Sequence, residues 1–185
     1  MAEQSKQSNG RAEIKALYQS MIHDLSISQR LAAFDVAGDL PQLARKAMEL
    51  LKGDEQEIAE AFWTHYSGIT DLANKSADYA SLKQRSIDAV REYTSEKLRN
   101  LSGQTWVEMA FINALQARKL GVPMWQLLAA QAHTHDFAMR KMAEKLSDDP
   151  EQYKQLGRAT AQVMVIEAEI MSTAINAITQ QESQA

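Results

Sequence analysis

Histidine is the side chain of this sequence best suited to metal binding and acid–base chemistry near neutral pH, and the chain has four of them. His133 and His135 form a His-Thr-His pair in a predicted helix. Residues two apart on a helix point about 200° away from each other, so this pair cannot share one metal ion. We expect His133 to face the core or a dimer seam and His135 to be solvated. We expect His65 to lie at the core edge with one hydrogen bond, and His23 to be exposed beside Asp24.

Two carboxylates, Glu167 and Glu169, interrupt the apolar face of the last predicted helix. Di-iron sites in helical bundles need a Glu-x-x-His motif, which neither glutamate begins. The sequence therefore predicts a solvated strip, or exposed contacts with Arg140, Lys141 or Lys145.

No residue pattern points to catalysis. The chain has no cysteine, which excludes disulfides, thiolate zinc sites and thiol nucleophiles. It shows no Ser/His/Asp order, no glycine-rich phosphate loop and no strand–turn–helix context. We expect neither an enzyme nor a metal site.

Composition limits the classes of protein and partner. The 185 residues are 45% hydrophobic and 24% charged, which suits one globular domain. The net charge is −4 and the basic residues are spread along the chain, so we expect no nucleic-acid partner. The polar start lacks a signal-peptide core and no apolar run is long enough to span a bilayer. These features predict a cytoplasmic protein without membrane insertion.

The elements that position these residues are predicted to be helices throughout. Seven glycines and three prolines are few, while strong helix formers are abundant. We therefore expect an all-α fold in which a weakly periodic connection at 69–77 is the loosest part. The chain divides into a disordered arm at 1–10, an N-terminal amphipathic helix at 11–27, the main domain at 28–181 and a tail at 182–185. Within the main domain, apolar spacing and glycine, proline and capping signals predict helices at 28–36, 39–53, 54–68, 79–99, 102–121, 123–146 and 150–180.

The last predicted helix is long, about 45 Å at 1.5 Å per residue, and has a broad apolar face with nearly heptad spacing. It could be the central core helix of a monomer. The sharper hypothesis is that a second face of it, with the preceding helix, forms a two-fold dimer interface. A charge at Val163 or Ile166 would then dissociate the dimer. The candidate interface residues are Met139, Val163, Ile166, Ile170 and Ala174.

Four segments carry a resemblance to a known family. In chain order they are RLAAFDVAGDLPQLARKAMELL, EIAEAFWTHY, QARKLGVPMWQLLAAQAH and YKQLGRATAQVMVIEAEIMSTAI. Together they resemble the sensor domain of bacterial globin-coupled sensors over about residues 28–180. The resemblance implies a globin-like fold that dimerises through the helices at 123–146 and 150–180. It also implies a signalling output module, and the chain is short for one, so we expect an excised domain or a stand-alone relative.

Two positions depart from the haem-binding pattern of that family. Its haem-ligating histidine lies four residues before the glycine of the corner, which here gives Ala117, with Gln116 beside it. Neither is a usual axial ligand of haem iron. The family's ligand-stabilising tyrosine is replaced by Trp63, after Phe62, and an indole is expected to fill the cavity. Leu82 falls at the family's apolar distal position.

These departures favour a haem-free sensory domain that relays a signal through a helical dimer. The candidate pocket consists of Phe62, Trp63, Leu82, Gln116 and Ala117, and it would take a small apolar ligand. The expected partners are a second copy of the chain and an output domain or partner protein. One alternative is a haem-binding gas sensor with an unusual axial ligand, His65, His133 or a neighbour of Gln116. Another is a structural helical adaptor, which predicts a filled core near Trp63.

Overall fold

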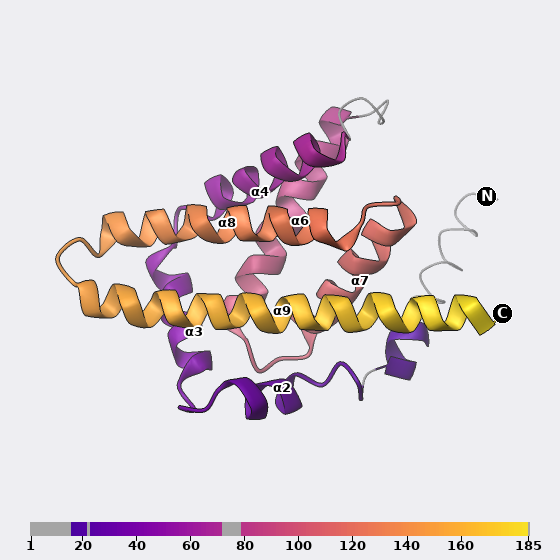
Figure 1. Ribbon diagram of the computed structural model, residues 1–185. Coiled ribbons are helices and arrows are strands. Elements are labelled where there is room, and N and C mark those ends of the chain that lie inside the picture. Colours follow the sequence, from indigo (N-terminus) through magenta and orange to yellow (C-terminus); the bar gives the residue numbers. More distant parts are fainter. Residues whose placement is uncertain (1–15, 22, 72–78, 185) are drawn as a thin grey trace.

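A computed structural model describes residues 16–21, 23–71 and 79–184, and the regular elements within these ranges are all α-helices (Figure 1). The expected arm at 1–10, the start of the leading helix and most of the expected loose connection at 69–77 lie outside the described residues. The all-α prediction is confirmed for the part of the chain that is described. Residues 16–21, within the predicted N-terminal helix, are helical. The helices that follow are α2 (Ile27–Phe34), α3 (Leu40–Leu50), α4 (Glu55–Thr70), α6 (Tyr79–Arg99), α7 (Thr105–Lys119), α8 (Met124–Lys145) and α9 (Pro150–Gln184).

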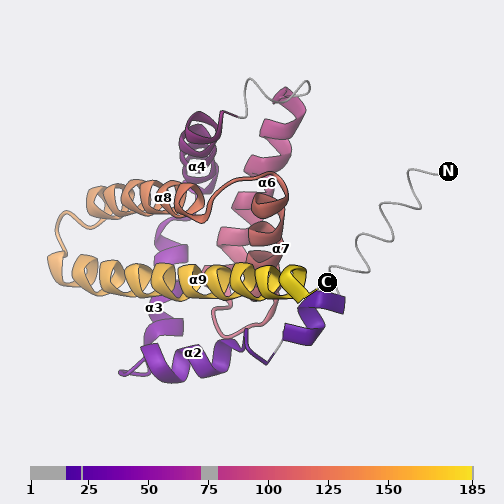
Figure 2. The same ribbon diagram turned by 45° about the vertical axis from the view of Figure 1, so that its right-hand side comes forward.

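The two last helices, α8 and α9, run antiparallel and form one layer of the molecule (Figures 1 and 2). Helices α3, α4, α6 and α7 cross behind this layer, and α2 lies along α9. With 35 residues α9 is about 52 Å long, so it packs against α2, α3, α7 and α8 in turn. One continuous hydrophobic core joins all these elements.

Four of the five candidate dimer residues lie inside this core. The side chain of Val163 is only 2% exposed, and those of Ile166, Ile170 and Ala174 are fully buried within the single chain. Only Met139 is partly exposed. A charge at Val163 or Ile166 would therefore be buried within one chain, where it would destabilise the fold itself.

By length and composition alone, the Pro150–Gln180 part of α9 is apolar enough to cross a membrane. Its large apolar side chains, however, pack in the core of this chain: Leu156, Ile166, Ile170 and Met171 are all among the fully buried residues. The hydrophobicity of α9 is thus accounted for by its central place in the fold.

The corner between α7 and α8 follows the sequence signal closely. Gly121 adopts φ +68°, a left-handed conformation that glycine reaches without steric cost. The Gly121 N–H donates to the Arg118 carbonyl at 2.9 Å, and the Val122 N–H donates to the Ala117 carbonyl at 2.8 Å. These two bonds form a Schellman motif, and Pro123 then ends the turn. The corner fixes the direction in which α8 leaves α7.

Several predicted helix starts differ in detail. The leading helix ends before 27, because residues 23–25 form a turn and Ser26 is extended. Asp54 makes no side-chain capping bond to the start of α4, since its backbone is already in the helical region. Its carboxylate instead pairs with Lys145 and Lys141 of α8. Helix α7 begins at Thr105, after Gln104 and not after Ser102.

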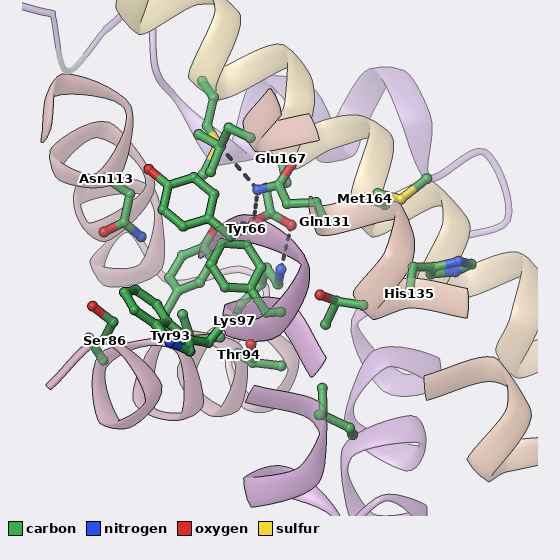
Figure 3. Close-up of a pocket in the computed structure, with 18 of the residues that line it drawn as sticks. Tyr66, Ser86, Tyr93, Thr94, Lys97, Asn113, Gln131, His135, Met164 and Glu167 are labelled. Atoms are coloured by element: carbon green, nitrogen blue, oxygen red, sulfur yellow. Dashed lines mark hydrogen bonds and ion pairs between the residues drawn. The ribbon is translucent and has the colours of Figure 1, made fainter. Parts of the chain in front are cut away.

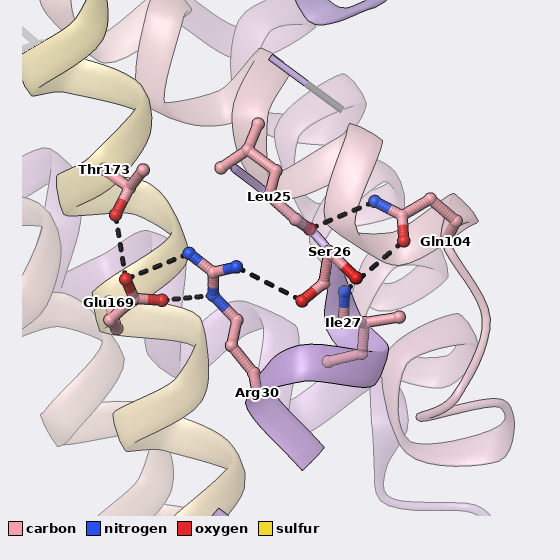
Figure 4. A network of polar contacts seen from close by, with 7 residues as sticks. All are labelled: Leu25, Ser26, Ile27, Arg30, Gln104, Glu169 and Thr173. Carbon is pink, nitrogen blue, oxygen red and sulfur yellow. Dashed lines mark hydrogen bonds and ion pairs between the residues drawn. The ribbon is translucent and has the colours of Figure 1, made fainter. Parts of the chain in front are cut away.

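The side chain of Gln104 forms hydrogen bonds with the backbone on either side of the start of α2. Its amide nitrogen donates to the Leu25 carbonyl at 3.1 Å, and its oxygen accepts a long bond of 3.5 Å from the Ile27 N–H (Figure 4). Arg30 of α2 then donates from Nε and Nη2 to Glu169 of α9, and from Nη1 to the Ser26 carbonyl. Glu169 was expected to be solvated or to meet basic residues of α8. It is instead the anchor that joins α2 to α9.

Candidate functional site

The core contains a cavity of about 270 Å³, with walls from α4, α6, α7, α8 and α9 (Figure 3). All five residues of the predicted pocket line it: Phe62, Trp63, Leu82, Gln116 and Ala117. Ala117 is buried, whereas Gln116 and the neighbouring Leu120 are exposed. Ala89 of α6 is the third exposed residue of the lining, so the cavity is open to solvent beside α6 and the end of α7.

Aromatic side chains of α4 form one wall. Phe62 stacks on Tyr66 with ring centroids 5.4 Å apart, and Trp63 contacts the rings of Tyr66 and Tyr79 at 6.4 Å and 5.7 Å. The Trp63 side chain is only 2% exposed. It was expected to fill the cavity. It lies in the wall instead, and room for a ligand remains beside it.

The opposite end of the cavity is polar, because the carboxylate of Glu167 on α9 is buried there and only 3% exposed. Tyr93 Oη donates to Glu167 Oε1 at 2.6 Å, and Gln131 Nε2 donates to the same oxygen at 2.8 Å. Lys97 forms an ion pair with Glu167 Oε2. Three helices, α6, α8 and α9, therefore meet at one carboxylate, as Figure 3 shows.

Burial and the charge of Glu167 raise the pKa of Tyr93 well above its ordinary value of 10. Its phenol therefore stays protonated and acts as a hydrogen-bond donor. The Lys97 ammonium offsets the charge of Glu167, so the polar end holds a compensated pair. The Nζ atom of Lys97 also lies 4.7 Å from the centre of the Tyr93 ring.

The polar end of the cavity was not predicted from the sequence. Glu167 was expected in a solvated strip or near Arg140, Lys141 or Lys145. The spacing did contain a signal, since Glu167 follows Val163 by four residues and precedes Ile170 by three, which places it on the core face of the helix. Tyr93, Lys97 and Gln131 were not singled out either.

Two buried polar atoms of the lining have no hydrogen-bond partner within the described part of the chain. They are the indole nitrogen Nε1 of Trp63 and the amide oxygen Oε1 of Gln131. A buried donor or acceptor left without a partner costs about 1–3 kcal/mol.

His23 is exposed beside Asp24 and His65 is partly buried, as expected, whereas His133 and His135 do not occupy their expected places. His133 is exposed, and its ring stacks on that of His65 with centroids 4.6 Å apart and an interplanar angle of 13°. His135, expected to be solvated, is half-buried, lines the cavity and shares a 3.2 Å hydrogen bond with Thr160 of α9. Burial lowers the pKa of His135. His133 thus meets α4 through His65, whereas His135 meets α9 through Thr160.

The family resemblance raises the question of whether the residues that line the cavity could bind haem. Haem iron needs an axial side chain that points into its pocket. His65 and His133, the proposed alternative ligands, are not among the residues that line the cavity. Ala117, at the family's ligand position, has only a methyl group, and the His135 ring is engaged by Thr160. The residues present therefore do not fit haem in the family's manner.

The described residues contain no group of three or more His, Asp or Glu side chains that could hold a metal ion. Comparison with known proteins gives no family: neither a protein-family model nor a curated protein matches this chain.

Proposed function

We propose that this chain is a non-catalytic sensory domain of the globin-like type, which works without haem and responds to a small apolar ligand. The observation that carries the proposal is the 270 Å³ cavity, which all five predicted pocket residues line. A purely structural adaptor needs no such space in its core, where close packing is the rule. A haem-binding sensor would need an axial ligand that faces the cavity and is free to bind iron. Among the described histidines only His135 lines the cavity, and its ring is hydrogen-bonded to Thr160.

The signal passes from the cavity to α9. Val163, Glu167 and Met171 of α9 line the cavity, so a ligand that enters it contacts the helix directly. Helix α9 continues to Gln184, well past the cavity. A small shift or rotation of α9 on ligand binding would reach an output module or a partner protein at its end.

A homodimer through the outward faces of α8 and α9 is part of this proposal. The two helices form one layer of the fold (Figure 1). Val165 is a large apolar side chain of α9 that is 48% exposed. Ala132 of α8 is exposed and Ala161 of α9 is partly exposed, and such small residues allow close approach of a second pair of helices.

The first experiment is an absorption spectrum of the protein purified from haem-replete cells, followed by calorimetric titration with propylbenzene. We expect no Soret band and binding of one hydrocarbon molecule per chain. A Soret band at near-stoichiometric haem would overturn the haem-free proposal. Failure of propylbenzene to bind would overturn the apolar-ligand proposal.

A matched pair of variants locates the binding. Ala117→Met adds bulk to the cavity wall, whereas Ala33→Met adds the same bulk on the exposed side of α2. We expect the first variant to weaken propylbenzene binding at least tenfold, since filled space is lost to the ligand, and the second to bind like the parent protein. Circular dichroism shows that both variants are folded. Equal affinities in the two variants would place the hydrocarbon elsewhere.

A further inference from the structure

The contact between α4 and α8 contains a pair of histidines that does not line the cavity. The rings of His65 on α4 and His133 on α8 stack with centroids 4.6 Å apart and an interplanar angle of 13°. His133 is exposed and His65 is partly buried, so small ions can reach the pair from the solvent. Because neither residue lines the cavity, the pair is separate from the proposed ligand site.

The ring nitrogens of this pair are available to a ligand. No described residue forms a hydrogen bond or an ion pair with either ring. The other two histidines are engaged, because His135 shares a hydrogen bond with Thr160 and His23 lies 3.7 Å from the Asp24 carboxylate. A neutral imidazole has one unprotonated nitrogen, and that nitrogen is the commonest metal ligand in proteins. The pair therefore offers two metal ligands from two helices.

The spacing of the two rings is close to that required by a shared ion. Zinc binds imidazole nitrogens at about 2.0–2.1 Å in a tetrahedral arrangement, which places two such nitrogens about 3.4 Å apart. In the stack the ring planes are nearly parallel, so their lone pairs do not converge. Rotation about χ2, which has a broad energy profile in histidine, turns the lone pairs toward one point. His133 has room for this rotation because it is exposed.

The composition of the site decides which ions it suits. Asp136 follows His133 by three residues on α8, but its carboxylate pairs with Arg140 at 3.3 Å. The described part of the chain contains no group of three His, Asp or Glu side chains suited to a metal ion. Two protein ligands leave the other positions to water, unlike the closed set of a structural zinc site. Imidazole ligands favour zinc, copper or nickel, whereas calcium and magnesium require oxygen ligands.

We infer that His65 and His133 form a two-histidine site for a divalent transition-metal ion of the zinc type, in which the ion joins α4 to α8. The unfolded chain does not hold the two rings together, so the ion binds the folded chain and stabilises it. Both helices also supply walls of the cavity, α4 through Phe62 and Trp63 and α8 through Gln131. A bound ion would hold these two walls together.

Calorimetric titration of the full chain with zinc chloride at about pH 7.5, where free imidazole is mostly neutral, tests the site. We expect one Zn²⁺ per chain, and binding at least tenfold weaker in His65→Gln and in His133→Gln. Loss of a group that only supports a metal ligand already lowers affinity about 10-fold to 100-fold, and these variants remove a ligand itself. His23→Gln and His135→Gln are the matched controls and should bind Zn²⁺ like the parent protein.

The midpoint of urea denaturation is a second measurement. Zn²⁺ should raise it in the parent protein and in His23→Gln, and should leave it unchanged in His65→Gln. An equal rise in all three proteins would overturn the inference. So would a parent protein that does not bind Zn²⁺, or a loss of affinity in His133→Gln alone, because the ion would then be bound by a single exposed imidazole.

Proton NMR of the parent protein decides the question even if His65→Gln does not fold. Two of the four histidine rings should respond to the first equivalent of Zn²⁺. A response of one ring, or of none, would contradict a shared site. Because neither histidine lines the cavity, each of these failures leaves the apolar-ligand proposal as it stands.

Discussion

The carboxylate of Glu167 is buried among Tyr93, Lys97 and Gln131, and the three contacts come from helices that are distant in sequence. Tyr93→Phe removes one donor and leaves the ring in place. Because a hydrogen bond to a buried charge is worth about 1.5–3 kcal/mol, we expect the free energy of unfolding to fall by that amount. Urea denaturation measures it.

Tyr66→Phe is the control for this substitution. Tyr66 lies in the same cavity and is also buried, but its hydroxyl makes no hydrogen bond to another described residue. We expect a change below about 0.5 kcal/mol. Equal losses in the two variants would show that the phenol of Tyr93 contributes nothing through Glu167.

His135 gives the fold a defined dependence on pH. Burial lowers its pKa below the ordinary 6.5, so the folded chain binds the proton less readily than the unfolded chain. The stability that depends on neutral His135 is therefore complete above about pH 6.5 and is lost as the pH falls toward the folded-state pKa. We expect His135→Gln to reduce the loss of unfolding free energy between about pH 7.5 and pH 5.5.

His23→Gln is the comparison for His135, since the side chain of His23 is 86% exposed. This variant should keep the acid sensitivity of the parent protein. If both variants lose stability on acidification as the parent does, the sensitivity resides in other groups.

At the scale of elements, α2 is joined to the rest of the fold through polar contacts. Arg30 is buried and meets Glu169, which also accepts from Thr173 at 2.9 Å. Arg30→Met should cost about 1–3 kcal/mol, because it leaves a partly exposed carboxylate without its partner. We expect faster amide hydrogen exchange in residues 23–34 with little change in α4 and α6. A uniform increase across the chain would contradict this local role.

The control for Arg30 is Arg158→Met. Arg158 pairs with Asp39 at 3.1 Å, but both side chains are about half exposed. Exposed pairs contribute about 0–1 kcal/mol, so exchange in α2 should stay close to that of the parent protein.

Sequence spacing predicted the helices better than their polar contacts. Helix α6 has the predicted bounds, 79–99, and Gly121 with Pro123 marked the α7–α8 corner, because these signals act within a few residues. Apart from Thr173, which is four residues from Glu169, the partners of Glu167 and Glu169 are 36 to 139 residues away. Such pairings depend on how whole helices pack, which one sequence does not reveal. The five cavity residues came from the family resemblance and not from spacing.

At the scale of the whole molecule, α9 has two different faces. One face packs in the core of the chain, and the other is exposed to solvent. Val163 and Val165 lie about 200° apart around this helix, and their exposed fractions are 2% and 48%. The inner face is filled by the chain itself. Any contact with a second copy must therefore use the outer face.

Val163→Glu and Val165→Glu separate these two faces with the same chemical change. A glutamate at 163 is buried without a partner, so we expect Val163→Glu to unfold the chain. A glutamate at 165 reaches water in a single chain, so that variant should keep its helical circular dichroism. In the proposed dimer the same charge would be trapped at the interface. Sedimentation should therefore show a dimer for the parent protein and a monomer for Val165→Glu. A parent protein that stays monomeric at high concentration, or a Val165→Glu variant that stays dimeric, would contradict an interface on this face of α9.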